Sequence, residues 1–220
     1  MTTPLRIAVL ASGRGSNLAA LIAARDAGGL PVEFSLVGSD RAAANALQLA
    51  EQSGIATLAL RPRDYASRLA FDLDLFGRVA DSGAELLILA GFMRIIEAQA
   101  LQPWIGQMIN IHPSLLPKYP GLHTHRRALE AGDTEHGASV HYVTAELDGG
   151  PVIAQVRMPI GPADDEQQLA QRLLPLEHRL MIAVVEAMAA RRLALVDDAV
   201  ACDGIRLQQP LQLLGDRLSR

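Results

Sequence analysis

The stretch Arg6-Ile-Ala-Val-Leu-Ala-Ser-Gly-Arg-Gly-Ser-Asn17 runs from an unbroken apolar segment through a glycine-containing loop into a helix-forming sequence. That helical sequence, rich in Ala, Leu and Ile, continues to Ala27 and stops at Gly28-Gly29. Continuous rather than alternating hydrophobicity is typical of a strand that is covered on both faces. The stretch therefore predicts the first strand, loop and helix of a sheet that is buried between helices.

The same alternation recurs through the first half of the chain. Four further apolar runs have the length of strands, at 33–37, 56–60, 85–90 and 108–111. Two more helical stretches, 41–53 and 65–82, each end just before a glycine, a common helix stop. Strand–helix alternation predicts an α/β fold with a doubly wound, mostly parallel sheet and helices on both faces. Ligands bind such sheets at the carboxyl ends of the strands, which here follow Ala11, Ala90 and Ile111.

The pattern changes after Gly132. The expected elements are strands at 138–143 and 152–159, a long helix at 164–191 and a hairpin at 193–206. Pro175 falls inside the long helix and predicts a kink or a break. Because no repeat, low-complexity segment or linker is visible, we expect a single domain over 1–220. Its N-terminal half is about 1–105 and its C-terminal half about 106–220.

Composition excludes several classes of protein. The 220 residues are 50% hydrophobic and 20% charged, which is ordinary globular usage. The net charge of −4 argues against a nucleic-acid binder, and the single cysteine, Cys202, cannot form an internal disulfide. The longest stretch without charged side chains, 98–117, contains three prolines, and the apolar run at 7–11 is too short for a signal peptide. We expect a cytoplasmic protein with no membrane or nucleic-acid partner.

The glycine loop is a candidate phosphate site. Glycines let backbone N–H groups approach an anion, and the helix N-terminus adds donors and a favourable dipole. A dinucleotide site would need a small residue where Leu18 stands, and no P-loop lysine follows. A single phosphate on Gly15, Ser16 and Asn17 fits better, although a plain tight turn explains the local sequence equally well.

Asn110 and His112 are the strongest candidates for catalysis. They stand two residues apart at the end of an apolar run, so both side chains leave an extended strand on the same side. An Asn amide can donate to a developing oxyanion, and a histidine can accept or give a proton. Hydrogen bonding of both side chains to nearby loops is the structural alternative.

Other polar residues are less informative by themselves. Asp148 precedes Gly149-Gly150 and is most simply a turn-former. His123 and His125 have a spacing that suits a metal, but no further ligand follows at a zinc-like distance, so no metal is expected. Arg94 could clamp an anion or be solvated.

Taken together, several motifs resemble the folate-dependent glycinamide ribonucleotide transformylase family. The matching segments are collinear and cover most of the chain: 15–18, 89–94, 110–121, 136–137 and 146–153. The run Asn-Ile-His-Pro-Ser-Leu-Leu-Pro, which starts at Asn110, is the most specific of them. The resemblance implies a Rossmann-like formyltransferase fold and transfer of a formyl group from 10-formyltetrahydrofolate to the amine of 5′-phosphoribosylglycinamide in purine biosynthesis.

The resemblance also implies roles for individual residues. Asn110, His112 and Asp148 would form the catalytic group, with Asp148 raising the pKa of His112 by opposite charge. Gly15, Ser16 and Asn17 would hold the ribonucleotide phosphate, and Glu177 would contact the sugar. The folate would be bound by Arg68, Met93, Arg94, Ile95, Ile96 and Asn110. No metal is implied, and self-association into a homodimer is left open.

Alternatives remain within and outside this family. A formyltetrahydrofolate hydrolase would use the same catalytic group on water, but such relatives carry an extra N-terminal domain, for which the first strand at Arg6 leaves no room. Transfer-RNA formyltransferases need a further C-terminal domain. A nicotinamide oxidoreductase is disfavoured by Leu18, and a non-catalytic nucleotide-binding protein would not explain the catalytic group. The segments 174–176 and 179–181, on either side of Glu177, depart from the family pattern.

Overall fold

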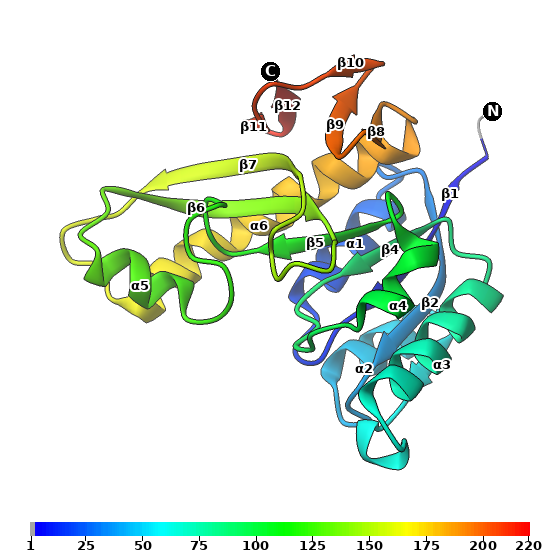
Figure 1. Ribbon diagram of the computed structural model, residues 1–220. Helices are drawn as coiled ribbons and strands as arrows, with labels where there is room; N and C mark the ends of the chain where they lie inside the picture. The colour runs from blue at the N-terminus through cyan, green and yellow to red at the C-terminus, as the bar shows by residue number, and fades with distance from the viewer. Residues whose placement is uncertain (1–2) are drawn as a thin grey trace. The chain divides into compact units, whose positions relative to one another are not determined.

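The computed structural model describes residues 3–220 and divides into two compact units, one ending at Asn110 and the other beginning at Ile111 (Figure 1). The division falls close to the predicted boundary near residue 105. The single-domain organisation over 1–220 stays a prediction. Within residues 3–220, no helix combines the length and the apolar character that crossing a membrane requires.

The first unit is built on a parallel sheet. Its strands are β1 (Leu5–Leu10), β2 (Val32–Ser39), β3 (Thr57–Ala59), β4 (Leu86–Leu89) and the start of β5 (Met108–His112). They are ordered β5-β4-β1-β2-β3, and each neighbouring pair is parallel. The five predicted strands of this half are therefore all present.

Helices connect these strands. They are α1 (Ser16–Asp26), α2 (Asn45–Gln52), α3 (Arg68–Asp81) and the short α4 (Ala98–Leu101), with 3-10 turns η1 (Pro62–Asp64) and η2 (Gln102–Trp104). Right-handed crossovers place α1 and α2 on one face, because β1, β2 and β3 follow one another across the sheet. The connection after β3 then runs back across the sheet to β4, on the far side of β1. A right-handed crossover in this opposite sense places α3 on the other face. The predicted α/β class with a mostly parallel, doubly wound sheet is confirmed.

Burial explains why these elements form. In β1, residues 7–10 are fully buried on both sides, as the continuous apolar run predicts. On α3, Phe71, Leu75 and Val79 repeat every four residues and are inaccessible to solvent. Each such side chain stabilises the fold by about 1.5–3 kcal/mol through removal of apolar surface from water. The helix begins at Arg68 rather than at residue 65, because the Ser67 hydroxyl accepts from the Ala70 N–H at 3.1 Å and caps it.

The second unit combines antiparallel strands with one long helix. Its elements are α5 (Thr124–Glu130), β6 (Glu135–Tyr142), β7 (Val152–Pro159), α6 (Glu166–Ala189), β11 (Leu211–Leu214) and β12 (Arg217–Ser219). The pairs β6–β7 and β11–β12 are antiparallel, whereas β11 and β7 are parallel. Helix α6 packs along β6 and β7 (Figure 1). Asp165 and Gln168 form a capping box at its start.

Pro175 does not break α6, so the prediction of a break is wrong. Its side chain faces solvent, where water can satisfy the carbonyl that a proline leaves without a donor. Leu173 and Leu180 on the opposite side are fully buried and hold the helix in place across this position.

The tail is larger than the hairpin predicted at 193–206. A separate antiparallel sheet contains β8 (Leu193–Val196), β9 (Ala199–Cys202) and β10 (Ile205–Arg206). The predicted turn at Asp203-Gly204 joins β9 to β10. The later strands β11 and β12 are too short to show a clear apolar pattern, and the sequence did not predict them.

Candidate active site

His112 and Asp148 come together at the end of β5. His112 Nδ1 lies 3.5 Å from Asp148 Oδ2, and the two side chains are only 7% and 9% exposed. Asn110 lies two residues earlier on the same strand, while the intervening Ile111 is buried on the other side. The structure thus brings His112 and Asp148 together, as the resemblance implies, and places Asn110 on the same strand side as His112.

Asp148 is held in a narrow turn. It adopts the left-handed conformation, with φ of 52°, and its Oδ2 accepts a hydrogen bond from the Gly121 N–H at 2.8 Å. A Cβ at Gly150 would lie 1.8 Å from the Tyr142 carbonyl oxygen, so only glycine fits where this turn rejoins β7. Gly150, one of the two glycines that made Asp148 resemble a simple turn-former, therefore allows the turn to pass close to Tyr142 of β6.

The pKa of His112 is lowered overall, although the charge of Asp148 acts in the expected direction and raises it. Burial is the largest cause, and it outweighs the opposite effects of the Tyr119 carbonyl and of the Asp148 charge. His112 Nε2 lies 2.9 Å from the Tyr119 carbonyl oxygen, which can only accept. Nε2 therefore carries a hydrogen, and the lowered pKa favours the neutral imidazole at about pH 7.

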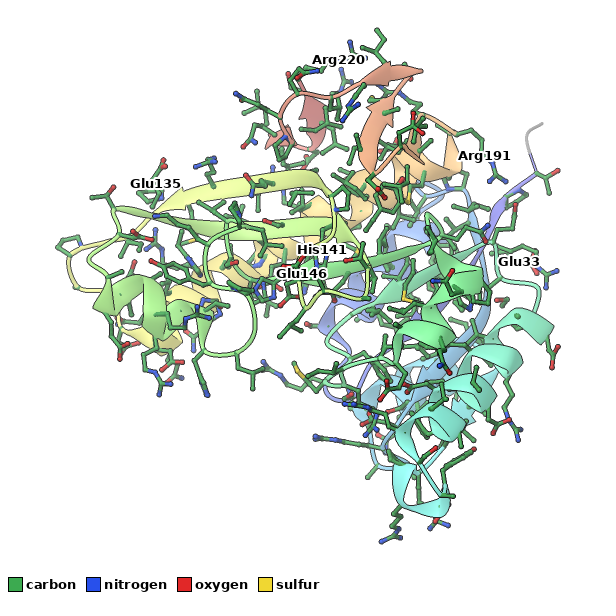
Figure 2. All side chains as sticks on the ribbon, viewed as in Figure 1. Glu33, Glu135, His141, Glu146, Arg191 and Arg220 are labelled. Carbon is green, nitrogen blue, oxygen red and sulfur yellow. The ribbon has the colours of Figure 1, made fainter. Side chains whose placement is uncertain are left out.

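His141 is a member of this cluster that the sequence analysis did not identify. It lies near the end of β6, is 2% exposed, and its Nε2 is 3.5 Å from Asp148 Oδ1. Its Nδ1 is 2.8 Å from the Tyr142 carbonyl oxygen. Figure 2 labels His141 on β6 and Glu146 in the turn that leads to Asp148. The sequence offered one sign of this role, a histidine inside the predicted strand 138–143. A histidine in such a strand is more often a buried structural residue.

Burial would raise the pKa of Asp148, but its hydrogen bonds with His141 and with the Gly121 N–H, together with nearby positive charge, leave that pKa below its usual value. The carboxyl group is therefore ionised at neutral pH. The cluster presents a carboxylate between two imidazoles.

A buried polar network fixes the loop that follows His112. The Ser139 hydroxyl donates to the Ser114 carbonyl at 2.7 Å and accepts from the Leu116 N–H at 3.1 Å. Gln155 Nε2 donates to the Leu116 carbonyl at 2.9 Å and to Ser139 at 3.0 Å. Because this network is buried and mutually hydrogen-bonded, it holds the Pro113–Pro117 segment rigidly beside His112.

The glycine loop has the geometry of an anion site. Gly15 is left-handed, with φ of 75°, and a Cβ there would lie 2.9 Å from Ala46. No side chain caps α1, whose first turn contains Ser16 and Asn17. Its first N–H groups thus have no side-chain acceptor at the N-cap, and the helix dipole favours an anion beside them. The predicted phosphate role of these residues agrees with this geometry and stays a prediction.

The segment after β4 and the start of α3 lie together in the first unit. The Arg68 guanidinium forms an ion pair with Glu97 at 2.5 Å, and Asp72 accepts from the Glu97 N–H at 2.8 Å. The Arg94 guanidinium stacks 4.7 Å from the centre of the Phe71 ring. Ile95, at 57% exposed, leaves apolar surface open. An apolar surface next to arginines suits a ligand with a flat apolar ring and an anionic tail, as expected for a folate.

The remaining predicted ligand residues are placed as follows. The Met93 N–H donates to the Ser12 hydroxyl at 2.9 Å, which ties this segment to the loop after β1. Ile96 follows in the same segment and is partly exposed. Glu177 lies in the middle of α6 and is half-buried. The binding roles of these residues stay predictions.

Residues 3–220 contain no group of three or more His, Cys, Asp and Glu side chains that could hold a metal ion. His125, one of the two histidines with metal-like spacing, instead has its Nδ1 2.9 Å from His136 Nε2. Burial is the largest cause that lowers the pKa of His136, to about 4.

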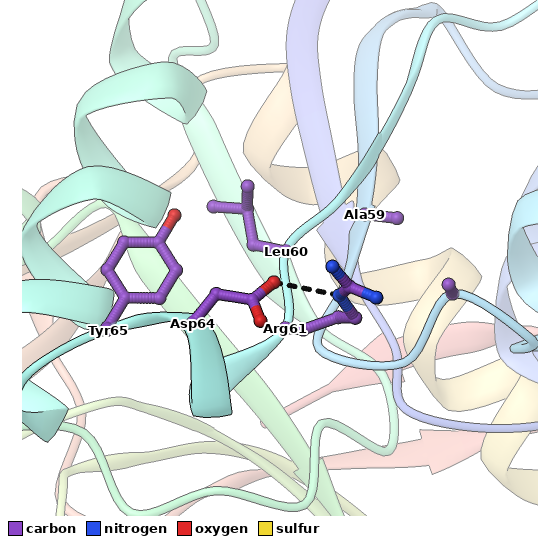
Figure 3. Close-up of a pocket in the computed structure, with 6 residues that line it drawn as sticks. Ala59, Leu60, Arg61, Asp64 and Tyr65 are labelled. Carbon is purple, nitrogen blue, oxygen red and sulfur yellow. Dashed lines mark hydrogen bonds and ion pairs between the residues drawn. The ribbon is translucent and has the colours of Figure 1, made fainter.

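A cavity of about 550 Å³ lies elsewhere in the first unit (Figure 3). It is lined by Ala42, Ala59, Leu60, Arg61, Asp64 and Tyr65. Arg61 and Asp64, both among the lining residues, are ion-paired at 2.7 Å. None of the predicted site residues lines this cavity, so it is not where we place the chemistry.

Comparison with known proteins decides the family. The model of the formyl transferase family matches residues 5–185. This chain belongs to the formyl transferase family. That match includes every predicted site residue, from Gly15 to Glu177, and leaves out the tail from residue 186 onward.

Individual formyl transferases are closely similar to this chain. The phosphoribosylglycinamide formyltransferase of Escherichia coli (strain K12) is 45% identical over 203 residues, which cover 92% of this chain and 96% of that protein. The structure of the phosphoribosylglycinamide formyltransferase from Coxiella burnetii aligns with a TM-score of 0.90 at 46% identity, over 93% of this chain and 96% of that one. A formyltetrahydrofolate deformylase from Burkholderia mallei has a TM-score of 0.82 at 27% identity, over 91% of this chain and 70% of that one.

Proposed function

We propose that this protein transfers the formyl group of 10-formyltetrahydrofolate to the amine of 5′-phosphoribosylglycinamide. The products are formylglycinamide ribonucleotide and tetrahydrofolate, and the reaction belongs to purine biosynthesis. The observation that carries the proposal is the pairing of His112 with Asp148. His112 is the last residue of β5, the strand that also contains Asn110. The formyl transferase family and the two phosphoribosylglycinamide formyltransferases at 45% and 46% identity support the same activity.

The reaction begins when the amine nitrogen attacks the formyl carbon. A nitrogen–carbon bond forms, and the π electrons of the carbonyl move to its oxygen, giving a tetrahedral oxyanion. The Asn110 amide can donate a hydrogen bond to that oxygen, an effect worth roughly 3 kcal/mol when the donor is preorganised. Collapse of the intermediate breaks the bond to the folate nitrogen, which leaves with the electron pair and takes up a proton.

His112 supplies the proton transfer. A neutral imidazole can accept the proton that the attacking amine must lose, and the lowered pKa of His112 keeps it neutral in the free enzyme. The imidazolium that forms is stabilised by ionised Asp148, 3.5 Å away. The same proton is then available for the departing folate nitrogen, so amine and folate exchange one proton and the enzyme returns to its starting state.

Substrate binding is divided among several segments. Gly15, Ser16 and Asn17 at the start of α1 hold the ribonucleotide phosphate. Met93, Arg94, Ile95 and Ile96 contact the folate ring, and Arg68 receives the anionic folate tail. Asn110 contacts the folate near the formyl group, and Glu177 contacts the ribose. We place the enzyme in the cytoplasm, with two small-molecule substrates, and leave homodimer formation to measurement.

A formyltetrahydrofolate hydrolase is the second candidate, since a water molecule in place of the amine would use the same three residues. The formyltetrahydrofolate deformylase from Burkholderia mallei is only 27% identical, and this chain covers 70% of its length. The transferase is therefore favoured.

The proposal is tested by following folate deformylation optically with purified protein. Turnover that requires glycinamide ribonucleotide supports the transferase. Equal folate turnover with and without the amine acceptor supports the hydrolase. No folate turnover in either assay contradicts both activities.

A further inference from the structure

Asp72 of α3 is an acid on a helix face that is otherwise apolar. Its side chain is inaccessible to solvent, as are those of Phe71 and Leu75 on the same helix. An aspartate is almost never fully buried unless it is paired, because the removal of a carboxylate from water is costly. An apolar side chain would pack here without that cost, so the packing of α3 alone does not explain the acid.

The hydrogen bond of Asp72 is made with the segment that follows β4. Asp72 Oδ2 accepts from the Glu97 N–H at 2.8 Å, and no donor within residues 3–220 reaches its other oxygen. Burial raises the pKa of Asp72, and the Glu97 N–H and the charge of Arg94 act against it. Because Glu97 is the N-cap of α4, its N–H has no acceptor inside that helix, and Asp72 supplies one.

Arg68 contacts the same residue from the same side of α3. Arg68 and Asp72 are four residues apart, which makes their side chains neighbours on the helix surface. The Arg68 guanidinium pairs with the Glu97 carboxylate at 2.5 Å, but the two side chains are 49% and 36% exposed. Exposed ion pairs contribute little to stability, so the buried bond of Asp72 is the contact that fixes Glu97 on α3.

Arg94 is tied to α3 by a separate contact. Its guanidinium stacks 4.7 Å from the centre of the Phe71 ring, and that ring also packs edge-on against Tyr65 at 5.3 Å. This contact does not involve Asp72 and would survive its loss. Loss of the Asp72 bond should therefore displace the 93–97 segment without releasing it, which predicts weaker folate binding and not its abolition.

We propose that Asp72 is a positioning residue for the folate: it fixes the Glu97 backbone and thereby sets the place of Arg68 and of the 93–97 segment. This inference rests on the proposed function for the identity of the ligand, since Arg68 and residues 93–96 are where we place the folate. Because Asp72 is fully buried, it acts through Glu97 and does not itself contact the ligand.

The first test compares Asp72→Ala with Asp72→Asn in formyl transfer. Alanine leaves the Glu97 N–H without an acceptor, whereas asparagine retains an oxygen that can accept. Asp72→Ala should raise the KM for 10-formyltetrahydrofolate by about tenfold or more, as expected for one lost buried hydrogen bond. The kcat and the KM for the ribonucleotide should change by less than about threefold. Asp72→Asn should restore most of the folate KM.

Leu75→Ala is the matched control for a general loss of stability. It removes a fully buried side chain from the next turn of α3 and should lower the melting temperature. It leaves the Glu97 N–H paired, so the folate KM should stay in place. An unchanged folate KM in Asp72→Ala, an equal rise in Leu75→Ala, or a loss confined to kcat would overturn the positioning role.

Glu97 offers a second pair of variants that leaves α3 unaltered. Its φ of −68° suits proline, so Glu97→Pro removes the N–H at a compatible backbone angle. Glu97→Ala removes the side chain and keeps the N–H. The folate KM should therefore rise further in Glu97→Pro than in Glu97→Ala, and equal values would contradict the proposal. This pair decides the question if Asp72→Ala does not fold.

Hydrogen exchange of the Glu97 amide tests the bond without any substrate. The amide should be protected in the unaltered protein and should exchange at least about tenfold faster in Asp72→Ala. Equal exchange in the two proteins would overturn the proposal. If Asp72 does protect this amide but the unaltered protein transfers no formyl group, the hydrogen bond stands and the proposed function fails instead.

Discussion

Asp148 Oδ2 lies 3.5 Å from His112 Nδ1, and the same oxygen accepts the Gly121 N–H at 2.8 Å. The carboxylate is therefore fixed before any substrate arrives, and it faces the one imidazole at the end of β5. Preorganised charge of this kind costs no rearrangement during the reaction and accounts for a large part of enzymatic rate enhancement.

His112→Ala should lower kcat by at least about 10²-fold while the KM values for both substrates change little. The reason is that His112 moves a proton in the transition state and is not placed to bind either ground state. Steady-state kinetics measures the effect. Near-normal kcat would remove His112 from the mechanism.

Asp148→Asn should also lower kcat by roughly 10²–10⁴-fold, because an amide cannot stabilise the imidazolium of His112. Circular dichroism and thermal unfolding check that the 145–150 turn still forms. A variant that is folded and retains most of its kcat would show that the charge of Asp148 is not needed.

Ser16→Glu should raise the KM for the ribonucleotide, since it places a negative charge in the first turn of α1, where we place the phosphate. The KM for the folate should stay nearly constant, because its residues lie on other segments. Gly13→Ala is a useful control, since no atom lies within 4 Å of the added Cβ. An unchanged ribonucleotide KM in Ser16→Glu would move the phosphate site elsewhere.

Gly150→Ala should destabilise the protein by several kcal/mol, roughly 3 or more, because the new Cβ would lie 1.8 Å from the Tyr142 carbonyl. Urea unfolding measures the change. Gly77→Ala is the opposite control: it lies inside α3 with open space around it, so it should stabilise by about 0.5–1 kcal/mol. Equal stability of the two variants would contradict the account of the Asp148 turn.

The buried His136 predicts a loss of stability in mild acid. Its pKa in the folded protein is lowered to about 4, mainly by burial, whereas an unfolded histidine titrates at about 6.5. Between these values the unfolded chain binds more protons, so the stability that neutral His136 provides is complete above about pH 6.5 and is lost as the pH falls toward 4.

The size of that effect is on the order of 3 kcal/mol for His136 alone. Because burial also lowers the pKa of His112 and of His125, the measurement compares urea unfolding of the unaltered protein with that of His136→Gln at about pH 7 and about pH 5. The unaltered protein should lose more stability on acidification. An identical loss in both proteins would show that His136 does not titrate as proposed.

Local sequence was sufficient for the parallel sheet and for part of the site. The buried strands β1, β2 and β4 are short, continuous apolar runs, and the helices between them end at glycines. The order of strands and helices along the chain could therefore be predicted. Asn110 and His112 were found because two polar side chains on one side of an apolar strand are unusual.

Tertiary contacts determine the rest. In the sequence Asp148 resembles a turn-former, and only the folded chain brings its carboxylate to His112 at the end of β5. This pairing was predicted only through the family resemblance. His141 was missed because a single histidine in an apolar strand has no local sign of its partner. The upward effect of the Asp148 charge on the pKa of His112 was predicted, but the larger downward effect of burial was not, because residue identity does not show how deeply a side chain is buried.

The most direct test of formyl transfer follows the formyl carbon itself. Purified protein is given folate with an isotopically labelled formyl group together with glycinamide ribonucleotide, and the products are separated and identified by mass spectrometry. The label should appear in the amide of formylglycinamide ribonucleotide in proportion to the tetrahydrofolate formed, and His112→Ala should form both products far more slowly. Label recovered as free formate while the ribonucleotide stays unformylated would contradict it.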